Sequence, residues 1–221
     1  KYRSDGDQKD KFALSVNKIS EKTIIQSKFT SEQFSKSGFK FKNKKIIYNS
    51  ADKSIFSNKG RKNFHPSCVK IVSASWSNNK KKGMDDYKWL DENLNKDLNY
   101  SFIGRLDFKP KNIKLIEPLG QRQLANKFRN SDIFIFSAKN ESCPNVLIEA
   151  IACGLPVIYK DSGSSKEIVK ELGLPYEDIS EVPEKLNFII KNYHHYKKLL
   201  MNYVCKEAYL EYEEIIHSLV K

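Results

Sequence analysis

The sequence contains no apolar run long enough to span a membrane and no recognisable signal peptide. Cysteine is scarce, and the spacing of Cys68, Cys143, Cys153 and Cys205 matches no metal-ligand pair. No Gly-x-Gly-x-x-Gly occurs, which argues against a dinucleotide-dependent oxidoreductase. We therefore expect a cytoplasmic protein whose thiols are reduced.

Metal ligands are also hard to find. The four histidines are not placed with acidic residues in a ligand pattern. Asp85 and Asp86 are adjacent carboxylates, but they stand at an expected helix start, where acids interact favourably with the helix dipole. From the residues alone, a helix start and a metal-binding carboxylate pair both remain open interpretations of Asp85 and Asp86.

The chain does have an excess of positive charge, with a formal net charge of +12. Such a charge suits an anionic substrate, an anionic membrane surface or nucleic acid, but abundant lysine on a solvated surface produces it as well. Lysine is dense only at 42–45 and 80–82 and is otherwise scattered. We expect mostly solvated lysines and no nucleic acid, with peripheral contact with the anionic inner face of a membrane as an open alternative.

The length of 221 residues allows one large domain, or one domain and part of another. The sequence opens on Lys-Tyr-Arg and not on Met, so we expect a fragment whose N-terminal part is missing. Residues 57–66 lack periodicity and predict a linker. This places one domain boundary between residues 1–64 and residues 65–221.

Strand patterns alternate with helix patterns along the chain. Strands are expected at 22–27, 44–49, 69–76, 100–104, 113–118, 132–137 and 156–159. Helices are expected after a cap at Thr30 or Ser31, at 84–98, around 124–128, at 145–153, after a capping box at 164–167, and throughout the tail after Pro183. The alternation predicts an α/β fold with a doubly wound parallel sheet.

A candidate site follows the strand 132–137, whose lack of polar alternation predicts burial on both faces. In such sheets ligands bind beyond the carboxyl ends of the strands. Pro144 suits the first turn of the following helix, because proline lacks an N–H. The free N–H groups of Asn145, Val146 and Leu147 would then form an anion site suited to phosphate.

Two glutamates flank this helix start. Glu149 lies one turn into the helix, where a carboxylate can accept hydrogen bonds from a ribose next to the phosphate. Glu141 lies in the preceding loop and can reach the far end of the same ligand. Their spacing alone is weak support, because two surface glutamates at this distance are common.

The segment 131–169 closely resembles the donor-binding domain of group 1, family four GT-B glycosyltransferases. The family pattern is Glu, seven residues, Glu, then Ala-x-Ala-x-Gly-x-Pro-Val, which here begins at Glu141 and Glu149 and ends at Val157. The resemblance implies that Glu149 binds the donor ribose and that Glu141 contacts the transferred sugar. The segment 22–56 is similar to the end of the acceptor-binding domain, so residues 1–64 are expected to be its remnant and 65–221 the donor domain.

The first donor-domain strand departs from the family pattern. That strand usually ends in Gly-Arg, with Lys-Gly about five residues later, and the Arg and Lys hold the diphosphate. Here Ser77 stands in place of the Arg, while Lys82 and Gly83 match the Lys-Gly. We expect Ser77 to line the site, and Lys82 to neutralise phosphate charge, because a Lys point charge suits a phosphate cradle. Arg105, at the end of another strand, is expected to help.

The resemblance implies transfer of a hexose-type sugar from a nucleotide diphosphate sugar to a glycan or lipid acceptor, with retention of configuration. It also implies no essential metal and no other cofactor, which favours the helix-start interpretation of Asp85 and Asp86. This fragment alone is expected to be inactive. A sugar-nucleotide 2-epimerase shares the layout, although the acids and histidine that it needs are not identifiable here. A non-catalytic nucleotide-sugar-binding module is the third reading, because the Arg is absent. The donor base, the sugar and the acceptor are not specified by the sequence.

Overall fold

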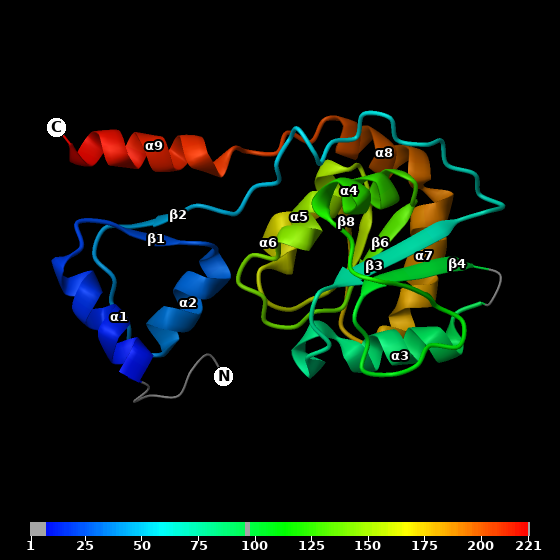
Figure 1. The fold of residues 1–221 in the computed structure, drawn as a ribbon, viewed down its shortest axis with the longest axis horizontal. Helices are drawn as coiled ribbons and strands as arrows, with labels where there is room; N and C mark the ends of the chain where they lie inside the picture. Colours follow the sequence, from blue (N-terminus) through cyan, green and yellow to red (C-terminus); the bar gives the residue numbers. More distant parts are fainter. Residues whose placement is uncertain (1–7, 96–97, 221) are drawn as a thin grey trace. The chain divides into compact units, whose positions relative to one another are not determined.

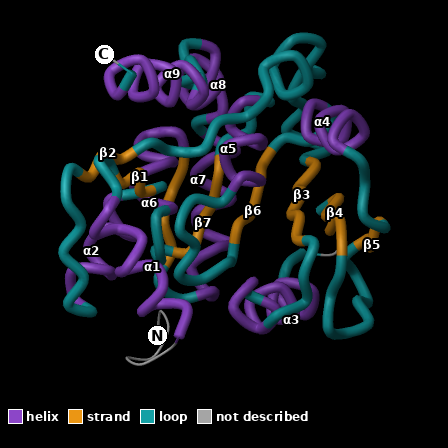
Figure 2. Tube along the Cα trace, turned by 60° about the vertical axis from the view of Figure 1, so that its left-hand side comes forward, coloured by secondary structure: helices purple, strands orange, loops and turns teal. Residues whose placement is uncertain are grey.

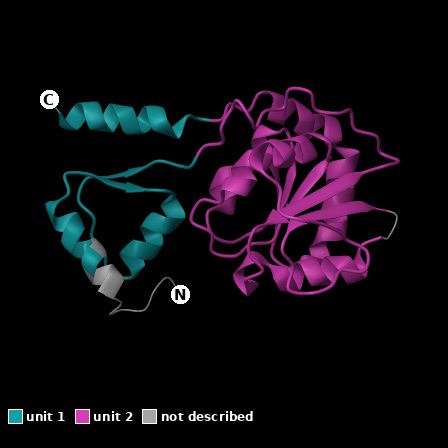
Figure 3. Ribbon diagram, viewed as in Figure 1, with its two compact units in different colours: residues 1–49, 206–221 teal, residues 50–205 magenta. Residues whose placement is uncertain are grey.

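A computed structural model describes residues 8–95 and 98–220 of the chain. It divides the chain into two compact units (Figure 3). The first unit comprises residues 1–49 and 206–221, and the second comprises residues 50–205. Within the described residues, no helix combines the length and apolar character that a bilayer crossing requires.

The second unit is built on a parallel sheet of six strands (Figure 1). The strand order is β5-β4-β3-β6-β7-β8, and every neighbouring pair is parallel. The strands are β3 (Lys70–Ser75), β4 (Asn99–Gly104), β5 (Lys114–Ile116), β6 (Ile133–Phe136), β7 (Val157–Lys160) and β8 (Gly173–Tyr176). The predicted doubly wound parallel sheet is therefore confirmed.

Helices cover both faces of this sheet. Neighbouring helices α4 (Gln121–Arg129), α5 (Asn145–Ala152) and α6 (Ser165–Val169) contact one another in sequence order. Figures 1 and 2 show α3 (Met84–Asn93) on the opposite side of the sheet from α4 and α5. Helix α7 (Val182–Lys191) packs on β7 and β8, and α8 (Tyr193–Met201) follows it. Short 3-10 turns lie at Lys80–Lys82, Lys170–Leu172 and Ile179–Glu181.

The core is centred on β6. Ile133, Phe134 and Ile135 have no exposed surface, because strands flank β6 on both edges and helices cover both of its faces. The Phe134 ring packs edge-on against Phe128 of α4, with 5.4 Å between ring centroids. An apolar run without alternation thus correctly predicted a fully buried strand.

The division between the two units differs in its bounds from the expected boundary at 64/65. Residues 50–64 belong to the second unit, and hydrogen bonds and a ring contact hold this segment against it. The Arg61 side chain donates to the carbonyl oxygens of Asp132 (3.3 Å) and Cys153 (3.4 Å). The ring of Phe64 stacks on Tyr193 at 3.8 Å. The roles expected for the two domains stay predictions.

The first unit contains α1 (Gln8–Ile19), β1 (Thr23–Ile25), α2 (Lys28–Lys36), β2 (Lys44–Ile46) and α9 (Ala208–Leu219). Strands β1 and β2 form a parallel pair. The Lys45 ammonium lies 3.7 Å from the Glu214 carboxylate, which links β2 to α9. The cap of α2 is Ser27, whose hydroxyl accepts from the N–H of Thr30, so the cap predicted at Thr30 or Ser31 was placed too late.

Other predicted boundaries also shift. Helix α3 ends at Asn93, so Leu98 lies outside it. The tail is interrupted between α8 and α9. Ser164 is the N-cap of α6, but its φ of −88° and ψ of 3° are not those of an extended cap residue, and the predicted cap bond does not form. Strand β8 was not predicted, because its Gly-Leu-Pro-Tyr sequence is typical of a turn.

Candidate active site

The switch point of the sheet lies between β3 and β6. Strand order runs from β3 toward β4 and β5 on one side, and from β6 toward β7 and β8 on the other. The connections leave such a point on opposite faces, which opens a crevice beyond the carboxyl ends of the two strands. A cavity of about 510 Å³ lies there. It is lined by Ala74, Ser75, Trp76, Ser77, Lys82, Tyr87, Gln121, Leu124, Phe136, Ala138, Glu141, Cys143, Pro144, Asn145, Val146 and Glu149.

The N-terminus of α5 forms one wall of this cavity. Pro144 is the N-cap residue, and Asn145 and Val146 line the cavity. The predicted set of three free amides needs a correction. The N–H of Leu147 donates to the Pro144 carbonyl at 3.2 Å, and the Leu147 side chain is fully buried. The helix therefore presents its first-turn residues Asn145 and Val146 to a ligand, without Leu147.

The loop that carries Glu141 is held from one side by the segment before α6. The N–H of Ser164 donates to the Glu141 carbonyl at 3.0 Å. Gly163 has a φ of +67°, and a Cβ there would lie 2.6 Å from the backbone nitrogen and oxygen of Glu141. Only glycine fits such a contact, so Glu141 rests on a backbone that has little room to move.

The same loop is joined on its other side to the loop that carries Lys82. The N–H of Lys139 donates to the Lys81 carbonyl at 2.7 Å. Gly83, at a φ of +83°, packs so closely that a Cβ would lie 2.3 Å from the Ser137 carbonyl oxygen. The two loops therefore bring Lys82 and Glu141 together although they are far apart in sequence.

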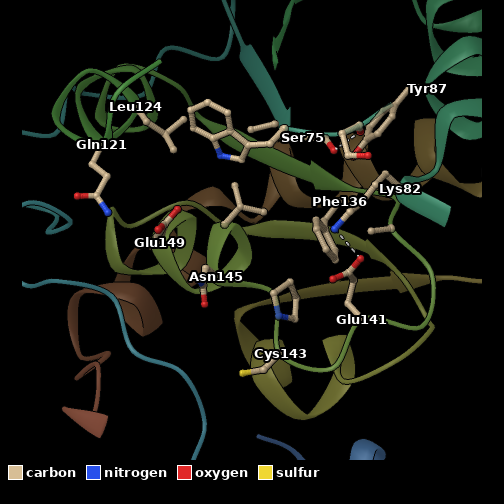
Figure 4. Close-up of a pocket in the computed structure, with 16 residues that line it drawn as sticks. Ser75, Lys82, Tyr87, Gln121, Leu124, Phe136, Glu141, Cys143, Asn145 and Glu149 are labelled. Atoms are coloured by element: carbon tan, nitrogen blue, oxygen red, sulfur yellow. Dashed lines mark hydrogen bonds and ion pairs between the residues drawn. The ribbon is translucent and has the colours of Figure 1, made fainter. Parts of the chain in front are cut away.

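Lys82 and Glu141 form an ion pair. The Lys82 ammonium lies 2.7 Å from a Glu141 carboxylate oxygen, and both side chains are partly buried (Figure 4). Partial burial reduces solvent screening, so this pair is stronger than one on an open surface. A ligand phosphate would have to share Lys82 with Glu141 or displace the carboxylate.

Glu149 is in the opposite situation. Within the described part of the chain its carboxylate has no hydrogen-bond or ion-pair partner. Burial raises the pKa of this carboxyl from 4.5 to about 6, because desolvation disfavours the charged form. Figure 4 shows Glu149 and Gln121 toward one end of the cavity and the Lys82–Glu141 pair toward the other. A ligand that donates hydrogen bonds to Glu149 would stabilise its ionised form.

The buried side chains of Tyr87 and Asp86 support the two loops from the interior of the unit. The N–H of Ser137 donates to the Tyr87 hydroxyl oxygen at 3.1 Å, and burial raises the Tyr87 pKa to about 12, so the phenol stays neutral. Asp86 accepts a 2.9 Å hydrogen bond from Tyr176, and the Lys139 ammonium lies 3.8 Å away from it. Asp86 thus does more than interact with the helix dipole, which was its expected role.

The remaining predicted residues lie in different places. Ser77 lines the cavity, and its hydroxyl accepts from the N–H of Asn79 at 3.2 Å. Arg105 is exposed and is not among the residues that line the cavity. The reason is topological, because Arg105 follows β4, which is separated from β6 by β3. The structure therefore brings together Ser77, Lys82, Glu141, Asn145, Val146 and Glu149, but not Arg105 or the Leu147 side chain.

Sequence reasoning missed several residues of the cavity wall, above all Trp76 and Gln121. Trp76 was included in the expected strand, but β3 ends at Ser75, and the indole that follows is 59% exposed. Gln121 is the first residue of α4. An aromatic residue directly after a strand that ends at the switch point was the signal available for Trp76. Among the described residues, no group of three or more His, Cys, Asp or Glu side chains could hold a metal ion.

One stretch of the chain matches a known protein family. Residues 93–202 match the family described as "Glycosyl transferases group 1". The match begins at the end of α3 and ends after α8, so it includes the loop of Glu141 and all of α5. No curated protein sequence matches the chain.

Many solved structures share this fold at low sequence identity. Sucrose-phosphate synthase from Thermosynechococcus elongatus is 16% identical with a TM-score of 0.71, over 98% of this chain and 64% of that one. HepE of Anabaena, in complex with UDP and glucose, is 14% identical with a TM-score of 0.74, over 96% and 66%. The pneumococcal O-GlcNAc transferase GtfA, in complex with UDP and GlcNAc, is 14% identical with a TM-score of 0.67, over 95% and 47%. The chain thus spans about half to two thirds of the length of these proteins.

Proposed function

The chain belongs to the group 1 glycosyl transferases, and from this premise we propose that it binds a nucleotide diphosphate sugar and takes part in the transfer of its hexose-type sugar to a glycan or lipid acceptor in glycan biosynthesis. One observation carries the proposal. Lys82, Glu141, the first turn of α5 and Glu149 line a single cavity at the switch point of a parallel sheet. The bound UDP and sugar in the structures of HepE and GtfA, which have the same fold, give further support.

The diphosphate would bind between Lys82 and the first turn of α5. The N-terminal end of a helix favours negative charge, and the Lys82 ammonium adds positive charge when the phosphate shares it with Glu141 or displaces the Glu141 carboxylate. Both groups would stabilise the diphosphate as it leaves the sugar and gains charge, which is the kind of assistance that contributes most to such reactions. No metal is needed for this neutralisation, so the reaction should survive chelation.

Glu149 would bind the ribose. It lies one helical turn beyond the amides of the phosphate site, and its carboxylate has no partner within the described residues. Two ribose hydroxyls could donate to it and replace the water lost on burial. The nucleoside would then lie toward Glu149, and the sugar would lie toward Glu141.

Glu141 would contact the transferred sugar at the other end. We expect retention of configuration without a general base from the protein, and the Glu141 carboxylate is already engaged by the Lys82 ammonium at 2.7 Å. In the proposed step the bond from the sugar C1 to the phosphate oxygen breaks, and the acceptor oxygen bonds to C1. The acceptor proton passes to the departing phosphate. The protein then needs no base of its own.

The acceptor and the location of the protein are further parts of the proposal. The net charge of +12 supports a cytoplasmic protein that touches an anionic membrane surface. In the first unit, Lys36, Lys40, Lys42 and Lys44 are exposed and available for such a contact. Vesicle flotation with and without anionic lipid would test this point separately from the chemistry.

The experiment that tests the proposed function has two steps. A thermal-shift panel of UDP-, GDP- and ADP-sugars identifies the donor, because a ligand that binds only the folded state raises the melting temperature. The donor found in this way is then incubated with the chain, joined to any upstream sequence of its gene, and the products are identified. Slow release of nucleoside diphosphate supports a transferase, an isomeric nucleotide sugar indicates an epimerase, and binding without turnover indicates a binding module.

A further inference from the structure

Asp86 is a buried carboxylate close to the loop that carries Glu141. It lies in the first turn of α3, and only 8% of its surface is accessible. One of its oxygens accepts the 2.9 Å hydrogen bond from the Tyr176 hydroxyl of β8, and the other lies 3.8 Å from the Lys139 ammonium. Burial of a charge is costly unless partners compensate it. The two oxygens of Asp86 therefore have separate partners, one on the sheet and one on the loop.

Lys139 connects this carboxylate to the end of the cavity that holds the ion pair. It precedes Glu141 by two residues, and its backbone N–H donates to the carbonyl of Lys81, the neighbour of Lys82. Lys139 is not among the described residues that line the cavity. Its side chain pairs with Asp86, so any influence of Lys139 on a reaction would pass through the position of the loop.

The next residue of α3 holds the same loop at a second point. The Tyr87 hydroxyl oxygen accepts from the N–H of Ser137 at 3.1 Å, directly after the end of β6. Two consecutive residues of α3 thus contact two alternate residues of the loop, Ser137 and Lys139. Two contacts fix the direction of a short segment as well as its position, and Glu141 follows on this segment.

We propose that Asp86 is a positioning residue for the transfer reaction, and that it acts through Lys139 to hold Glu141 in place beside Lys82. The inference rests on the proposed function, because Glu141 must contact the transferred sugar for its position to affect turnover. It adds a role in turnover to two residues outside the cavity wall. The role is physically reasonable, because a misplacement of about 1 Å at a reacting group can slow a reaction strongly.

A second buried aspartate on the same helix provides a matched control. Asp91 is 2% exposed, and its carboxylate accepts from the N–H groups of residues 111–113, which lead into β5. The Asp86→Asn and Asp91→Asn variants each remove one buried charge from α3, so both should lower the melting temperature. Only Asp86→Asn should change the loop of Glu141.

Hydrogen exchange measures this loop without any ligand. The amides of Ser137 and Lys139 are hydrogen-bonded to the segment of α3 and the loop before it. In Asp86→Asn they should exchange roughly tenfold faster than in the unmodified protein, because local opening becomes easier. In Asp91→Asn their exchange should be unchanged.

Turnover of the nucleotide sugar tests the functional part, in the chain joined to any upstream sequence of its gene. Asp86→Asn should lower kcat roughly tenfold and leave the affinity for UDP and GDP unchanged, which is a weaker form of the effect expected of Glu141→Gln. Lys139→Gln should give a similar loss, and Lys139→Arg, which keeps the charge, should recover most of it. The Asp86→Asn/Lys139→Gln double variant should lose no more than either single variant, because both changes remove one interaction.

The possible failures are distinguishable. Faster exchange of the loop amides with an unchanged kcat overturns this inference alone. An equal loss of kcat in Asp91→Asn overturns it too, because a general loss of stability would then explain the result. Additive losses in the double variant would show that Asp86 does not act through Lys139. If Asp86→Asn fails to fold, Lys139→Gln decides, because the Lys139 side chain is partly exposed and an unchanged kcat there contradicts the inference. Absence of nucleoside diphosphate release by the unmodified protein would overturn the inference and the proposed function together.

Discussion

The two ends of the cavity hold the same kind of residue in opposite states. At one end the Glu141 carboxylate is 2.7 Å from the Lys82 ammonium. At the other end Glu149 has no partner within the described residues, and burial raises its pKa to about 6. The charge of the Glu141 carboxylate is compensated by Lys82 within the protein. The Glu149 carboxylate can obtain hydrogen bonds only from a ligand or from water.

The difference shows that a shared residue type does not imply a shared role. A carboxylate in an ion pair gains little free energy from additional hydroxyl donors, but it determines how far the neighbouring ammonium is available to a ligand. A desolvated and unpaired carboxylate gains more from each hydrogen bond that it accepts. Of the two glutamates, Glu149 should therefore contribute directly to the affinity for nucleotide, whereas Glu141 should act mainly through Lys82 and on turnover.

The largest expected effect comes from Gly83→Ala, which would disturb the paired end. A Cβ at Gly83 would lie 2.3 Å from the Ser137 carbonyl oxygen, and the φ of +83° adds backbone strain. We expect a loss of about 3 kcal/mol or more in the free energy of unfolding, measured by chemical denaturation. Gly60→Ala is the matched control in the same unit, because Gly60 has a φ of +76° and open space around it. Equal losses in both variants would show that Gly83 does not hold the loops together.

Lys82→Ala should give the next largest effect. Removal of the ammonium should weaken nucleoside diphosphate binding by about 1.5–3 kcal/mol, since a charge-assisted contact to phosphate is lost. Lys81→Ala removes the same charge from an exposed neighbour and should have little effect. Calorimetric titration of both variants makes the comparison. Similar losses would mean that only the general positive charge matters.

The pH dependence of binding separates the two ends further. The folded-state pKa of Glu149 is raised to about 6, so its proton must leave before ribose hydroxyls can donate to the carboxylate. Nucleotide affinity should therefore rise with pH through 6, and should be about tenfold lower at pH 5 than at pH 7. The phosphate of the nucleotide also titrates in this pH range. The pH dependence of affinity in the unmodified protein is therefore compared with that in the Glu149→Gln variant. If the variant keeps the whole pH dependence, Glu149 is not the group responsible.

The smallest expected effect is that of Glu149 on the free energy of unfolding. Stability should fall as pH rises, whereas nucleotide affinity should increase. Because the folded pKa lies above the unfolded value of 4.5, stability is lost as pH rises from 4.5 through 6. Glu149→Gln should thus stabilise the unliganded protein at pH 7, by about 1 kcal/mol after allowance for solvent screening, and not at pH 4. Denaturation at both pH values measures this. A variant that is less stable at pH 7 would contradict the assignment of an unpaired carboxylate.

The part of the site on one continuous segment was predictable from the sequence. Strand β6, the loop of Glu141 and the helix with Glu149 follow one another, so local patterns and the order of elements were enough. The Lys82–Glu141 pair was not predictable, because the two residues are 59 positions apart and meet only through the contacts of Gly83 and Lys139.

Other errors have equally specific causes. Arg105 was expected in the site because it ends a strand, but the strand order, which local patterns do not contain, puts β3 between it and β6. The N–H of Leu147 was expected to be free, but a tight first turn uses it within the helix. The exposure of Trp76 depends on where β3 ends, and strand ends are poorly specified by apolar runs.

The division of labour between the two glutamates is tested most directly by calorimetric titration of Glu149→Gln and Glu141→Gln with UDP and GDP. Glu149→Gln keeps the shape of the side chain but removes the charged acceptor, so nucleotide affinity should fall by about 1.5–3 kcal/mol. Glu141→Gln releases Lys82 from its ion pair, so affinity should stay the same or rise slightly, while turnover of the nucleotide sugar falls. An equal loss of nucleotide affinity in both variants would contradict the division.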